Sequence, residues 1–475
     1  MSIRNFLTKD HQLPPFSTYR SPLLWALVCV LLPNLFFWIV AGLGNLARPL
    51  INFDYFLPVL LMALPLPWRL GKILGGVALV FAIAVDLIMF AMQIFPFLDI
   101  AAIRYLAPFI HTAPLRLLLL SAVAIIYALL FPFLQNWTMR KTSLKWVILI
   151  LCVIGLPSWY LQYDKYHETY GLRFARGNHY FAHSQVQLYR SEIGDDFYRL
   201  TQMEPVIMPN HKENASQRFR QPFADKVLLV VAESWGMSRE PTVHRAILQN
   251  IYNQQENLAF IEEGFFDFYG ATVQGEIREL CNFNTENGYA FSKLPAETFE
   301  SCLPNVFKKA GYQTVGLHGA SSLLYDRNAW YPHVGFQKTV FGEHLLNLKK
   351  CYAFNGVCDE EMLNIIGDEF KQAGKQKTFV YWLTLTAHLP YDVGDMRSER
   401  FDCDALNVTK GDICNNMRLQ SQLFDDLGEL IKRPEMKGVE VIVVGDHMPP
   451  IMGDVPLYKN LHFNDVAWLH FKVKE

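Results

Sequence analysis

Four short apolar runs in the second half of the chain each end beside a residue that can bind a metal ion or a phosphate. Glu233 follows the first run, His318 the second and His388 the third, while the fourth run leads into Asp446 and His447. In open α/β sheets, ligands bind beyond the carboxyl ends of the parallel strands. Four such run ends are hard to explain by surface solvation alone. We therefore predict that these side chains belong to one polar site.

Glutamate, aspartate and histidine together offer a mixed set of oxygen and nitrogen ligands, which suits Zn²⁺ or Mn²⁺. Three protein ligands leave a coordination position open for a nucleophile or a substrate oxygen. A metal ion in such a site polarises a phosphoryl oxygen and lowers the pKa of a bound hydroxyl group. One divalent metal ion, Zn²⁺ or Mn²⁺, is therefore the predicted cofactor.

Thr272 is the candidate nucleophile. It follows the small residues Gly270 and Ala271 and begins a stretch with helical character. A hydroxyl group at a helix N-terminus gains from the helix dipole as it becomes an alkoxide, and the free backbone N–H groups beside it suit a phosphate. A threonine in this position is also a common N-cap, with no chemical role. Taken alone, the position of Thr272 leaves both interpretations open.

The order of these motifs resembles the alkaline phosphatase superfamily. Glu-Ser-Trp begins at residue 233, and it is followed by Thr272, by His-Gly from residue 318, by Ala-His-Leu-Pro from residue 387 and by Asp-His from residue 446. The membrane-bound branch, which holds lipoteichoic acid synthase, the glucan phosphoglycerol transferases and the lipid A phosphoethanolamine transferases, is the most similar. The resemblance implies five transmembrane helices and one extracytoplasmic α/β domain with a mostly parallel central sheet. It also implies a metal ion held by Glu233, Thr272, Asp446 and His447, with Thr272 as the nucleophile.

The same resemblance implies five substrate-binding residues. His318, Tyr325 and Arg327 have the spacing of the headgroup-binding stretch of lipoteichoic acid synthase, in which tryptophan stands at the position of Tyr325. His388 matches a substrate-side histidine of the family, and His462 is similar to another, although its spacing differs. Arginine can hold a phosphate with a fork of donors, but Arg327 is also compatible with a simple ion pair.

The implied reaction is a two-step transfer. Thr272 attacks the headgroup phosphate of a phospholipid and carries the headgroup as a phospho-threonine, and a hydroxyl group of a glycolipid or polysaccharide then displaces it. His388 or His318 would handle the proton of the leaving or entering oxygen. Phosphatidylethanolamine and phosphatidylglycerol are the candidate donors. The headgroup-binding stretch favours phosphoglycerol and the cysteine-rich outer domain favours phosphoethanolamine, which is our preferred prediction.

Two other functions compete with this prediction. A sulfatase or phosphatase of the superfamily would hydrolyse its substrate, but a sulfatase needs a cysteine or serine in a C-x-P-x-R setting, and the sequence after Cys281 lacks it. An inactive member would act as a scaffold in polysaccharide export. The presence of the complete ligand set argues against the scaffold.

The elements that must position these residues are buried strands that alternate with helices. Short apolar runs suit parallel strands covered on both faces. The predicted strands are 227–232, 314–317, 378–385 and 439–444, and the predicted helices between them include 303–310 and 360–371. The alternation indicates an α/β catalytic domain over residues 223–475. Residues 163–222 are predicted to form a connector that can contain interfacial helices.

Residues 1–162 are predicted to form a transmembrane domain with five apolar spans. They are Pro22–Leu43, Phe56–Trp68, Ile73–Phe95, Leu115–Leu134 and Leu144–Leu161. A crossing needs about 20 residues, so the second span must borrow flanking residues or be re-entrant or interfacial. Asp86 lies inside the third span, where a carboxylate is either functional or paired with another span.

The basic residues near the span ends predict the orientation. One side carries Arg4, Lys9, Arg20, Arg69, Lys72, Arg140, Lys141 and Lys145, and the opposite loops carry only Arg48, Arg104 and Arg116. We therefore expect a multi-pass protein of a bacterial inner membrane, with the N-terminus in the cytoplasm and the catalytic domain in the periplasm. A net charge of −2 gives no indication of a nucleic-acid partner, and we expect a monomer.

Six of the eight cysteines lie in the predicted soluble part. Their proximity in the sequence favours the pairs Cys281–Cys302, Cys351–Cys358 and Cys403–Cys414, although six cysteines allow fifteen pairings. Free thiols or zinc ligands are the alternative. Disulfides would place this part in an oxidising compartment, which agrees with the orientation predicted from charge.

Overall fold

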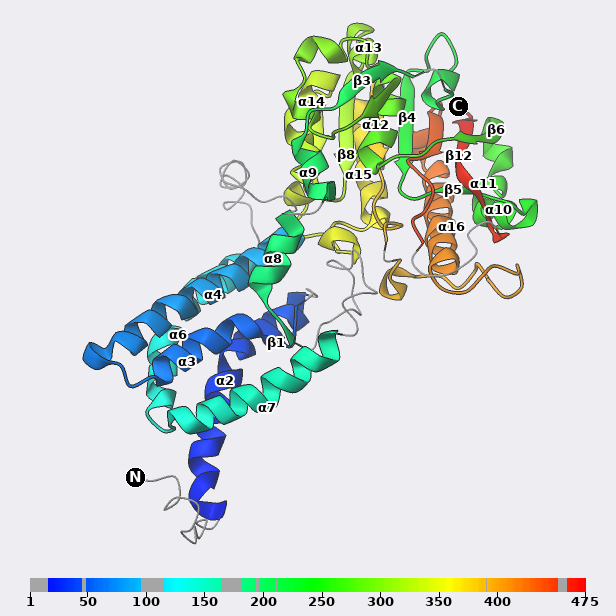
Figure 1. Cartoon of the computed structure of the whole chain (residues 1–475). Coiled ribbons are helices and arrows are strands. Elements are labelled where there is room, and N and C mark those ends of the chain that lie inside the picture. The colour runs from blue at the N-terminus through cyan, green and yellow to red at the C-terminus, as the bar shows by residue number, and fades with distance from the viewer. Residues whose placement is uncertain are drawn as a thin grey trace, which may run out of the picture. The chain divides into compact units, whose positions relative to one another are not determined.

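The computed structural model describes residues 16–44, 48–94, 115–163, 182–193, 196–210, 212–389, 391–451 and 459–475 (Figure 1). The chain divides into two compact units. Among the described residues, the helical unit contains those up to Phe90, those from Arg116 to Tyr163 and those from Ala182 to Ser191. The sheet unit contains the described residues from Glu192 onward, and residues 91–94 and 115 are grouped with it.

In the described part of the helical unit, three helices are long and apolar enough to cross a membrane. Their candidate spans are Arg20–Gly42, Pro67–Met92 and Ala122–Met139. They lie in α2 (Phe16–Gly44), in α4 (Leu70–Ile94) with the short turn before it, and in α6 (Leu115–Met139). The first, third and fourth predicted spans are therefore present as candidate membrane helices. Two shorter apolar helices, Phe53–Ala63 and Leu144–Pro157, occupy the places of the other two.

The second predicted span is shorter than expected. Its helix, α3 (Phe56–Ala63), has only eight residues. Pro65 and Pro67 follow closely, and proline has no backbone N–H with which to continue a helix. The chain turns through Trp68 and Arg69, which both have positive φ, and then enters α4. The fifth predicted span corresponds to α7 (Leu144–Tyr163), whose apolar part ends at Pro157.

Asp86 is fully buried in the helical unit and is paired. Arg48 donates to both of its carboxylate oxygens, over 3.0 Å and 2.8 Å. Asn52 and Gln185 donate over 3.1 Å and 2.8 Å, and the hydroxyl group of Tyr55 also donates to it. Of the two alternatives for the carboxylate in the third predicted span, a functional or a paired group, the structure therefore shows a paired group.

The residues around Asp86 also bind a segment that follows the apolar helices in the chain. The strand β1 (Ile51–Asn52) pairs in parallel with β2 (Ala182–His183). Asp54 then accepts hydrogen bonds from the Ser184 hydroxyl and, over 2.9 Å, from the Val186 backbone at the start of α8 (Gln185–Ile193). Part of the predicted connector is thus fixed to the helical unit.

The sheet unit is built on an eight-stranded mixed sheet. Its strands are β4 (Lys226–Ala232), β5 (Gly236–Ser238), β6 (Leu258–Asp267), β8 (Gln313–His318), β9 (Lys338–Val340), β10 (Thr378–Leu383), β11 (Glu440–Gly445) and β12 (Leu461–Val473). The order is β5-β12-β11-β4-β10-β8-β9, with β6 paired to β12. From β11 to β9 all pairs are parallel, and β12 is antiparallel to its neighbours. The predicted mostly parallel α/β sheet is confirmed.

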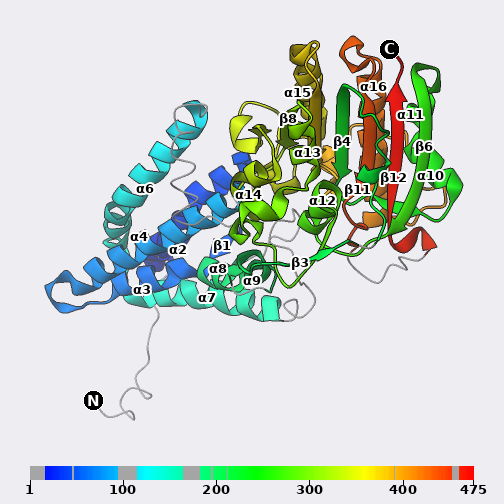
Figure 2. The ribbon, with the colours of Figure 1, turned by 90° about the horizontal axis from the view of Figure 1, so that it is seen from above.

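The apolar runs form strands because both faces of the sheet are covered. In β4, Leu228 and Val230 belong to one hydrophobic core, and Val227 and Leu229 belong to the other. Alternate residues of a strand point to opposite faces, so a strand with two cores is apolar throughout. The first core lies under α10 (Pro241–Ile247), α11 (Gln249–Tyr252), α15 (Asp359–Ala373) and α16 (Asp412–Ile431), and the second under α12 (Thr272–Cys281), α13 (Leu303–Lys309) and α14 (Arg327–Val334) (Figure 2).

The smaller elements and the cross-links complete the sheet unit. Helix α9 (Asp196–Gln202) and strand β3 (Val206–Pro209) precede the sheet, and β3 pairs with β7 (Phe283–Glu286). All three predicted disulfides are present, as Cys281–Cys302, Cys351–Cys358 and Cys403–Cys414. The two remaining cysteines, Cys29 and Cys152, are free.

Candidate active site

Three predicted metal ligands converge at the carboxyl ends of two neighbouring strands. β4 and β11 are parallel with Ala232 opposite Gly445, so the residues that follow, Glu233 and Asp446, lie at the same level. Together with His447 they offer ligand atoms that all lie within 4.8 Å of one another. Glu233 and Asp446 are buried. Carboxylates that are buried so close together need a compensating positive charge.

The hydrogen bonds around these residues leave ligand atoms free. Asp446 Oδ1 accepts the backbone N–H groups of Ser234 and His447 over 2.7 Å and 2.6 Å, whereas its buried Oδ2 has no hydrogen-bond partner within the described part of the chain. His447 Nδ1 donates to the Met448 carbonyl over 2.9 Å, so in the neutral ring Nε2 carries the lone pair. Nε2 lies 3.3 Å from Asp446 Oδ2 and 3.6 Å from Glu233 Oε1. The residues therefore fit a divalent metal ion.

The electrostatics of the trio point the same way. Burial, reinforced by the nearby Glu233 carboxylate, raises the pKa of Asp446 to about 7. Burial alone would lower the pKa of His447, but the carboxylates of Asp446 and Glu233 outweigh it and raise that pKa. The site therefore attracts positive charge, which a proton or a metal ion supplies.

Thr272 lies against this trio. Its Oγ1 is 3.3 Å from Glu233 Oε2 and 3.4 Å from His447 Nε2. Thr272 is the first residue of α12, and Ala271 occupies the N-cap position with extended backbone angles. The Gln274 side chain accepts the Ala271 backbone N–H over 2.8 Å. The hydroxyl group of Thr272 is therefore not an N-cap, and it faces the metal-ligand residues.

Two residues that the sequence did not single out fix α12 to the metal-ligand segment. Arg278, which is buried, donates to the carbonyl oxygens of Gly445 and Asp446 over 2.7 Å and 3.1 Å, and it pairs with the buried Glu279 over 2.7 Å. A Cβ atom at Gly275 would lie 2.6 Å from the Asp446 carbonyl oxygen, so the helix approaches this closely only because residue 275 is glycine. No local pattern marks Arg278, because the two carbonyl oxygens to which it donates lie more than 160 residues away.

Arg327 is completely buried and lies in an ion pair. Its Nε and Nη2 donate to Glu276 Oε2 over 3.0 Å and 2.6 Å, and its Nη1 donates to the Leu324 carbonyl over 3.1 Å. Tyr331 and Tyr381 donate to the other oxygen of Glu276, the latter over 3.1 Å. Because Glu276 lies one turn after Thr272 in α12, this network braces the helix of the candidate nucleophile. Phosphate binding by Arg327 stays a prediction.

His318 and Tyr325 lie buried near that network. His318 Nδ1 donates to the Leu383 carbonyl over 3.0 Å, and its Nε2 has no hydrogen-bond partner among the described residues. Burial, with the Arg327 charge nearby, lowers the pKa of His318 well below its usual value, so the ring is neutral at pH 7. Tyr325 has a left-handed backbone, with φ of 60°, and its ring meets that of Tyr289 edge to face at 5.9 Å.

The remaining predicted histidines occupy different places. His388 Nδ1 bonds to the Leu389 carbonyl, and burial lowers its pKa to about 4, helped by the charge of His447. His462 is partly exposed, pairs with Asp465 over 3.6 Å and stacks on Phe265. None of the contacts of His462 within the described residues reaches the metal-ligand trio.

Comparison with known families agrees with this geometry. The family model described as Sulfatase matches residues 225–467, which is just over half of the chain. The chain belongs to the sulfatase family. This sulfatase-family domain therefore carries its Glu233, Thr272, Asp446 and His447 cluster within the matched residues. No curated protein matches the chain.

Solved structures that are similar to the sulfatase-family domain share little sequence with it. An alkaline phosphatase superfamily protein from Vibrio parahaemolyticus is 19% identical, over 56% of this chain and 63% of that chain, with a TM-score of 0.42. The lipoteichoic acid synthase LtaP from Listeria monocytogenes is 16% identical, over 52% and 65%, with a TM-score of 0.38. The C-terminal periplasmic domain of EcEptC from Escherichia coli, in complex with Zn, is 14% identical, over 56% and 77%, with a TM-score of 0.34. The chain covers less than two thirds of the first two structures.

Proposed function

We propose that this sulfatase-family protein is a metal-dependent phosphotransferase that carries a phospholipid headgroup on Thr272. The observation that carries the proposal is the position of the Thr272 hydroxyl group, 3.3 Å from Glu233 and 3.4 Å from His447 at the N-terminus of α12. A nucleophile needs its base or metal ligand within this distance, and the helix N-terminus stabilises developing negative charge.

Glu233, Asp446, His447 and the Thr272 hydroxyl would hold one Zn²⁺ or Mn²⁺ ion. When bound, the ion supplies Lewis-acid polarisation of the phosphoryl group and favours ionisation of the hydroxyl group beside it. The buried Oδ2 of Asp446, which has no hydrogen-bond partner among the described residues, and the lone pair of His447 Nε2 support this assignment.

In the first step, Thr272 Oγ1 loses its proton to solvent and bonds to the headgroup phosphorus, while the bond from phosphorus to the diacylglycerol oxygen breaks and that oxygen takes a proton from water. The Thr272 hydroxyl group donates a hydrogen bond to Glu233 Oε2 over 3.3 Å, which orients Oγ1. In the second step, the acceptor oxygen loses its proton and bonds to the phosphorus, while the bond from phosphorus to Thr272 Oγ1 breaks and Oγ1 takes a proton from water. His388 and His318 have lowered pKa values, so both rings are neutral at pH 7. Neutral imidazoles suit the role of a base that accepts the proton of the entering hydroxyl group.

We take phosphatidylethanolamine as the donor, with phosphatidylglycerol as the alternative, and a glycolipid or polysaccharide as the acceptor. Three disulfides in the sheet unit support an oxidising compartment, which is the periplasm in a bacterial cell. The candidate membrane helices would keep the protein in the inner membrane beside its lipid donor. The proposed arrangement has five crossings, in which the eight residues of α3 would need the residues on either side of it to reach across, and α7 is the other short span.

The geometry argues against a sulfatase that depends on formylglycine. The only cysteine in α12 is Cys281, at the end of the helix, and it is bonded to Cys302. The residue that contacts the metal-ligand trio is instead a threonine. Hydrolysis would require water in place of the acceptor hydroxyl group in the second step.

Mass spectrometry of the purified protein tests the proposal. After incubation with phosphatidylethanolamine or phosphatidylglycerol and Zn²⁺ or Mn²⁺, the peptide that contains Thr272 should gain the mass of one headgroup phosphate. The adduct should be absent in Thr272→Ala, and its mass identifies the headgroup. An adduct only with phosphatidylglycerol would reverse our choice of donor. Absence of any adduct with both lipids would contradict the transferase.

A further inference from the structure

The Cys351–Cys358 disulfide closes a short loop beside the active site, and we refer to these residues as the 351–358 loop. We propose that this loop is a positioning element for His388: Phe354 holds the imidazole ring, Asp359 holds the backbone that leads to it, and the disulfide keeps both in place. The inference rests on the proposed function, in which His388 accepts a proton in the second step.

Backbone hydrogen bonds and the disulfide together define the loop. The Cys351 N–H donates to the Gly356 carbonyl over 2.9 Å, and the Cys358 N–H donates to the Lys349 carbonyl over 3.1 Å. Between them, Phe354 and Asn355 both have φ of 49°. Left-handed backbone is uncommon for residues other than glycine, and it persists only where the surroundings enforce it. The packing around the 351–358 loop therefore holds Phe354 and Asn355 in this conformation.

The loop packs against the segments that follow two strands of the sheet. The Val357 N–H donates to the Gly319 carbonyl over 2.8 Å, directly after β8. A Cβ atom at Gly319 would lie 2.4 Å from the Val357 carbonyl oxygen, and one at Gly356 would lie 2.2 Å from the Leu385 side chain. The first approach, between two backbones, requires glycine, whereas a Cβ atom at residue 356 would displace the Leu385 side chain. The loop is therefore fitted between the residue after His318 and the segment that leads to His388.

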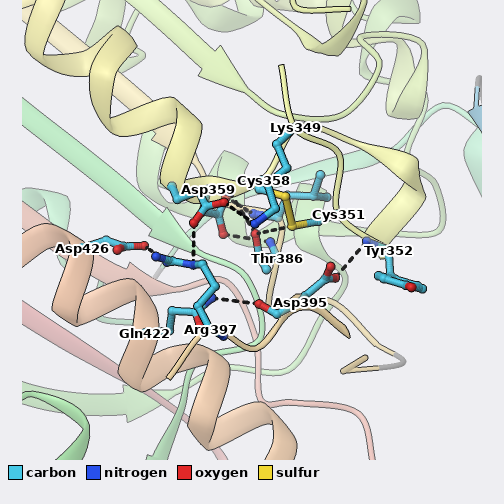
Figure 3. Close-up of a disulfide and its surroundings, with 12 residues drawn as sticks. Lys349, Cys351, Tyr352, Cys358, Asp359, Thr386, Asp395, Arg397, Gln422 and Asp426 are labelled. Atoms are coloured by element: carbon cyan, nitrogen blue, oxygen red, sulfur yellow. Dashed lines mark hydrogen bonds and ion pairs between the residues drawn. A yellow bond between two sulfur atoms is a disulfide. The ribbon is translucent and has the colours of Figure 1, made fainter. Parts of the chain in front are cut away.

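Asp359, directly after the disulfide, holds that second segment (Figure 3). Its two carboxylate oxygens accept the backbone N–H groups of Leu385 and Thr386 over 2.9 Å and 2.8 Å. The Asp359 N–H donates in return to the Thr386 hydroxyl over 3.0 Å. The His388 N–H then donates to the Leu385 carbonyl over 3.0 Å. The turn that carries His388 is thus fixed to the residue beside Cys358.

The carboxylate of Asp359 accepts these hydrogen bonds in a buried position. Burial raises the pKa of Asp359 to about 7, although the N–H groups of Thr386 and Leu385 lower it. Nearby, Arg397 forms ion pairs with Asp426 (Figure 3) and with Glu360, the residue after Asp359. The carboxylate that anchors the turn is therefore buried beside a set of ion pairs.

Phe354 makes the direct contact with His388. The two ring centroids are 4.5 Å apart and the rings are tilted by 54°. Phe354 also packs against Ala320 and Leu385, so it has a fixed position of its own. His388 is then held on one side by Phe354 and at Nδ1 by the Leu389 carbonyl. These contacts orient Nε2, the nitrogen that would accept a proton.

The test separates the two steps of the reaction. Full-length protein in dodecyl maltoside is pulsed with headgroup-labelled phosphatidylethanolamine, and with phosphatidylglycerol in parallel. Adduct on the Thr272 peptide is followed during the pulse and during a chase, with water and the maltoside sugar as the entering hydroxyl groups. Phe354→Ala should form the adduct at the wild-type rate but lose it about tenfold to a hundredfold more slowly, because misplacing a base impairs only the step that uses it.

Three variants and one control complete the test. Phe354→Tyr, which keeps the ring, should restore the decay rate, and Cys351→Ser/Cys358→Ser and Asp359→Asn should behave like Phe354→Ala. The matched control is Phe223→Ala. Phe223 lies just before β4, and its ring also contacts another ring at 4.5 Å, that of Phe307 in α13. Phe223→Ala should lower the melting temperature without changing the decay.

The outcomes distinguish this inference from the function on which it rests. If wild-type protein forms no adduct, the transferase itself is wrong, and the inference with it. If His388→Ala retains adduct but Phe354→Ala does not, the transferase stands and the loop does not position His388. Equal slowing of formation and decay in Phe354→Ala would also overturn the inference, because it would show a general loss of structure.

Discussion

Both units contain a buried carboxylate cluster, and the two clusters differ in how their charge is satisfied. Asp86 in the helical unit receives five side-chain hydrogen bonds, two of them from Arg48. Asp446 in the sheet unit receives two backbone N–H groups on Oδ1 and, among the described residues, none on Oδ2. A cluster whose charge is balanced by the protein is complete, whereas one with unbalanced charge at a strand end requires a ligand. The comparison therefore indicates a structural role for the Asp86 cluster and a metal-binding role for the Asp446 cluster.

Asp446→Asn tests the second half of the comparison and should have the largest effect. The amide removes a metal ligand, so catalysis should fall by about a thousandfold or more, since a metal ion contributes several kcal/mol to the transition state. The metal-free variant should be at least as stable as metal-free wild type, because a buried carboxylate beside Glu233 has been neutralised. Turnover and thermal unfolding in the presence of a chelator measure the two effects. A variant that keeps its turnover would break the comparison.

Asp86→Asn tests the first half. It leaves the buried guanidinium of Arg48 without its counter-charge, which should destabilise the helical unit by about 3–5 kcal/mol. Unfolding in detergent, followed by limited proteolysis that reports on fragments of each unit separately, measures this loss. The double variant Asp86→Asn/Arg48→Met is the control and should recover part of the stability. A stable Asp86→Asn single variant with impaired turnover would instead show that this cluster has a catalytic role.

Arg278→Met tests whether Arg278 holds the segment that carries Asp446 and His447 in place. It leaves the carbonyl oxygens of Gly445 and Asp446 without donors and Glu279 without its charge partner. Metal affinity should fall by about tenfold to a hundredfold, as for other residues that orient ligands. Competition with a chelator of known affinity measures the change. Arg218→Met, which removes a partly exposed arginine paired with Glu213, should leave the affinity unchanged.

The smallest expected effect is the pH dependence of metal binding. Burial raises the pKa of metal-free Asp446 to about 7, so below that pH the carboxyl group holds a proton that the metal ion must displace. The apparent Kd should therefore increase by about tenfold or more for each pH unit below 7, because the nearby carboxylates also raise the pKa of His447, whose proton the metal ion must displace as well. Calorimetric titration with Zn²⁺ between pH 5.5 and about 8 measures the slope. A Kd that does not change over this range would contradict the assignment of Asp446 as a ligand.

The fold could be predicted where the signal is local. β4, β8, β10 and β11 are visible as apolar runs because strands with two cores have no polar face. The disulfides could be guessed because each pair is at most 21 residues apart. The second membrane span was predicted as too long, since the apolar pattern continues to Leu66 although the prolines at 65 and 67 end the helix first.

The site could be predicted only in part, for a related reason. The ligand residues stand at strand ends, where topology alone brings them together. Arg327 is held in an ion pair by Glu276, which lies 51 residues earlier in the chain. Arg278 donates to carbonyl oxygens of a segment more than 160 residues later. The contact between Phe354 and His388 depends on a loop held by long-range packing. Such pairings are set by tertiary structure and leave no periodic trace in the sequence.

Metal analysis of the purified protein tests the central claim most directly. Wild-type protein, washed free of loosely bound ions, should contain one equivalent of Zn²⁺ or Mn²⁺ per chain, and the Glu233→Gln/Asp446→Asn variant should contain almost none while keeping its disulfides. Equal metal content in the two proteins would place the ion elsewhere. Wild-type protein that neither contains nor takes up either ion would contradict the account.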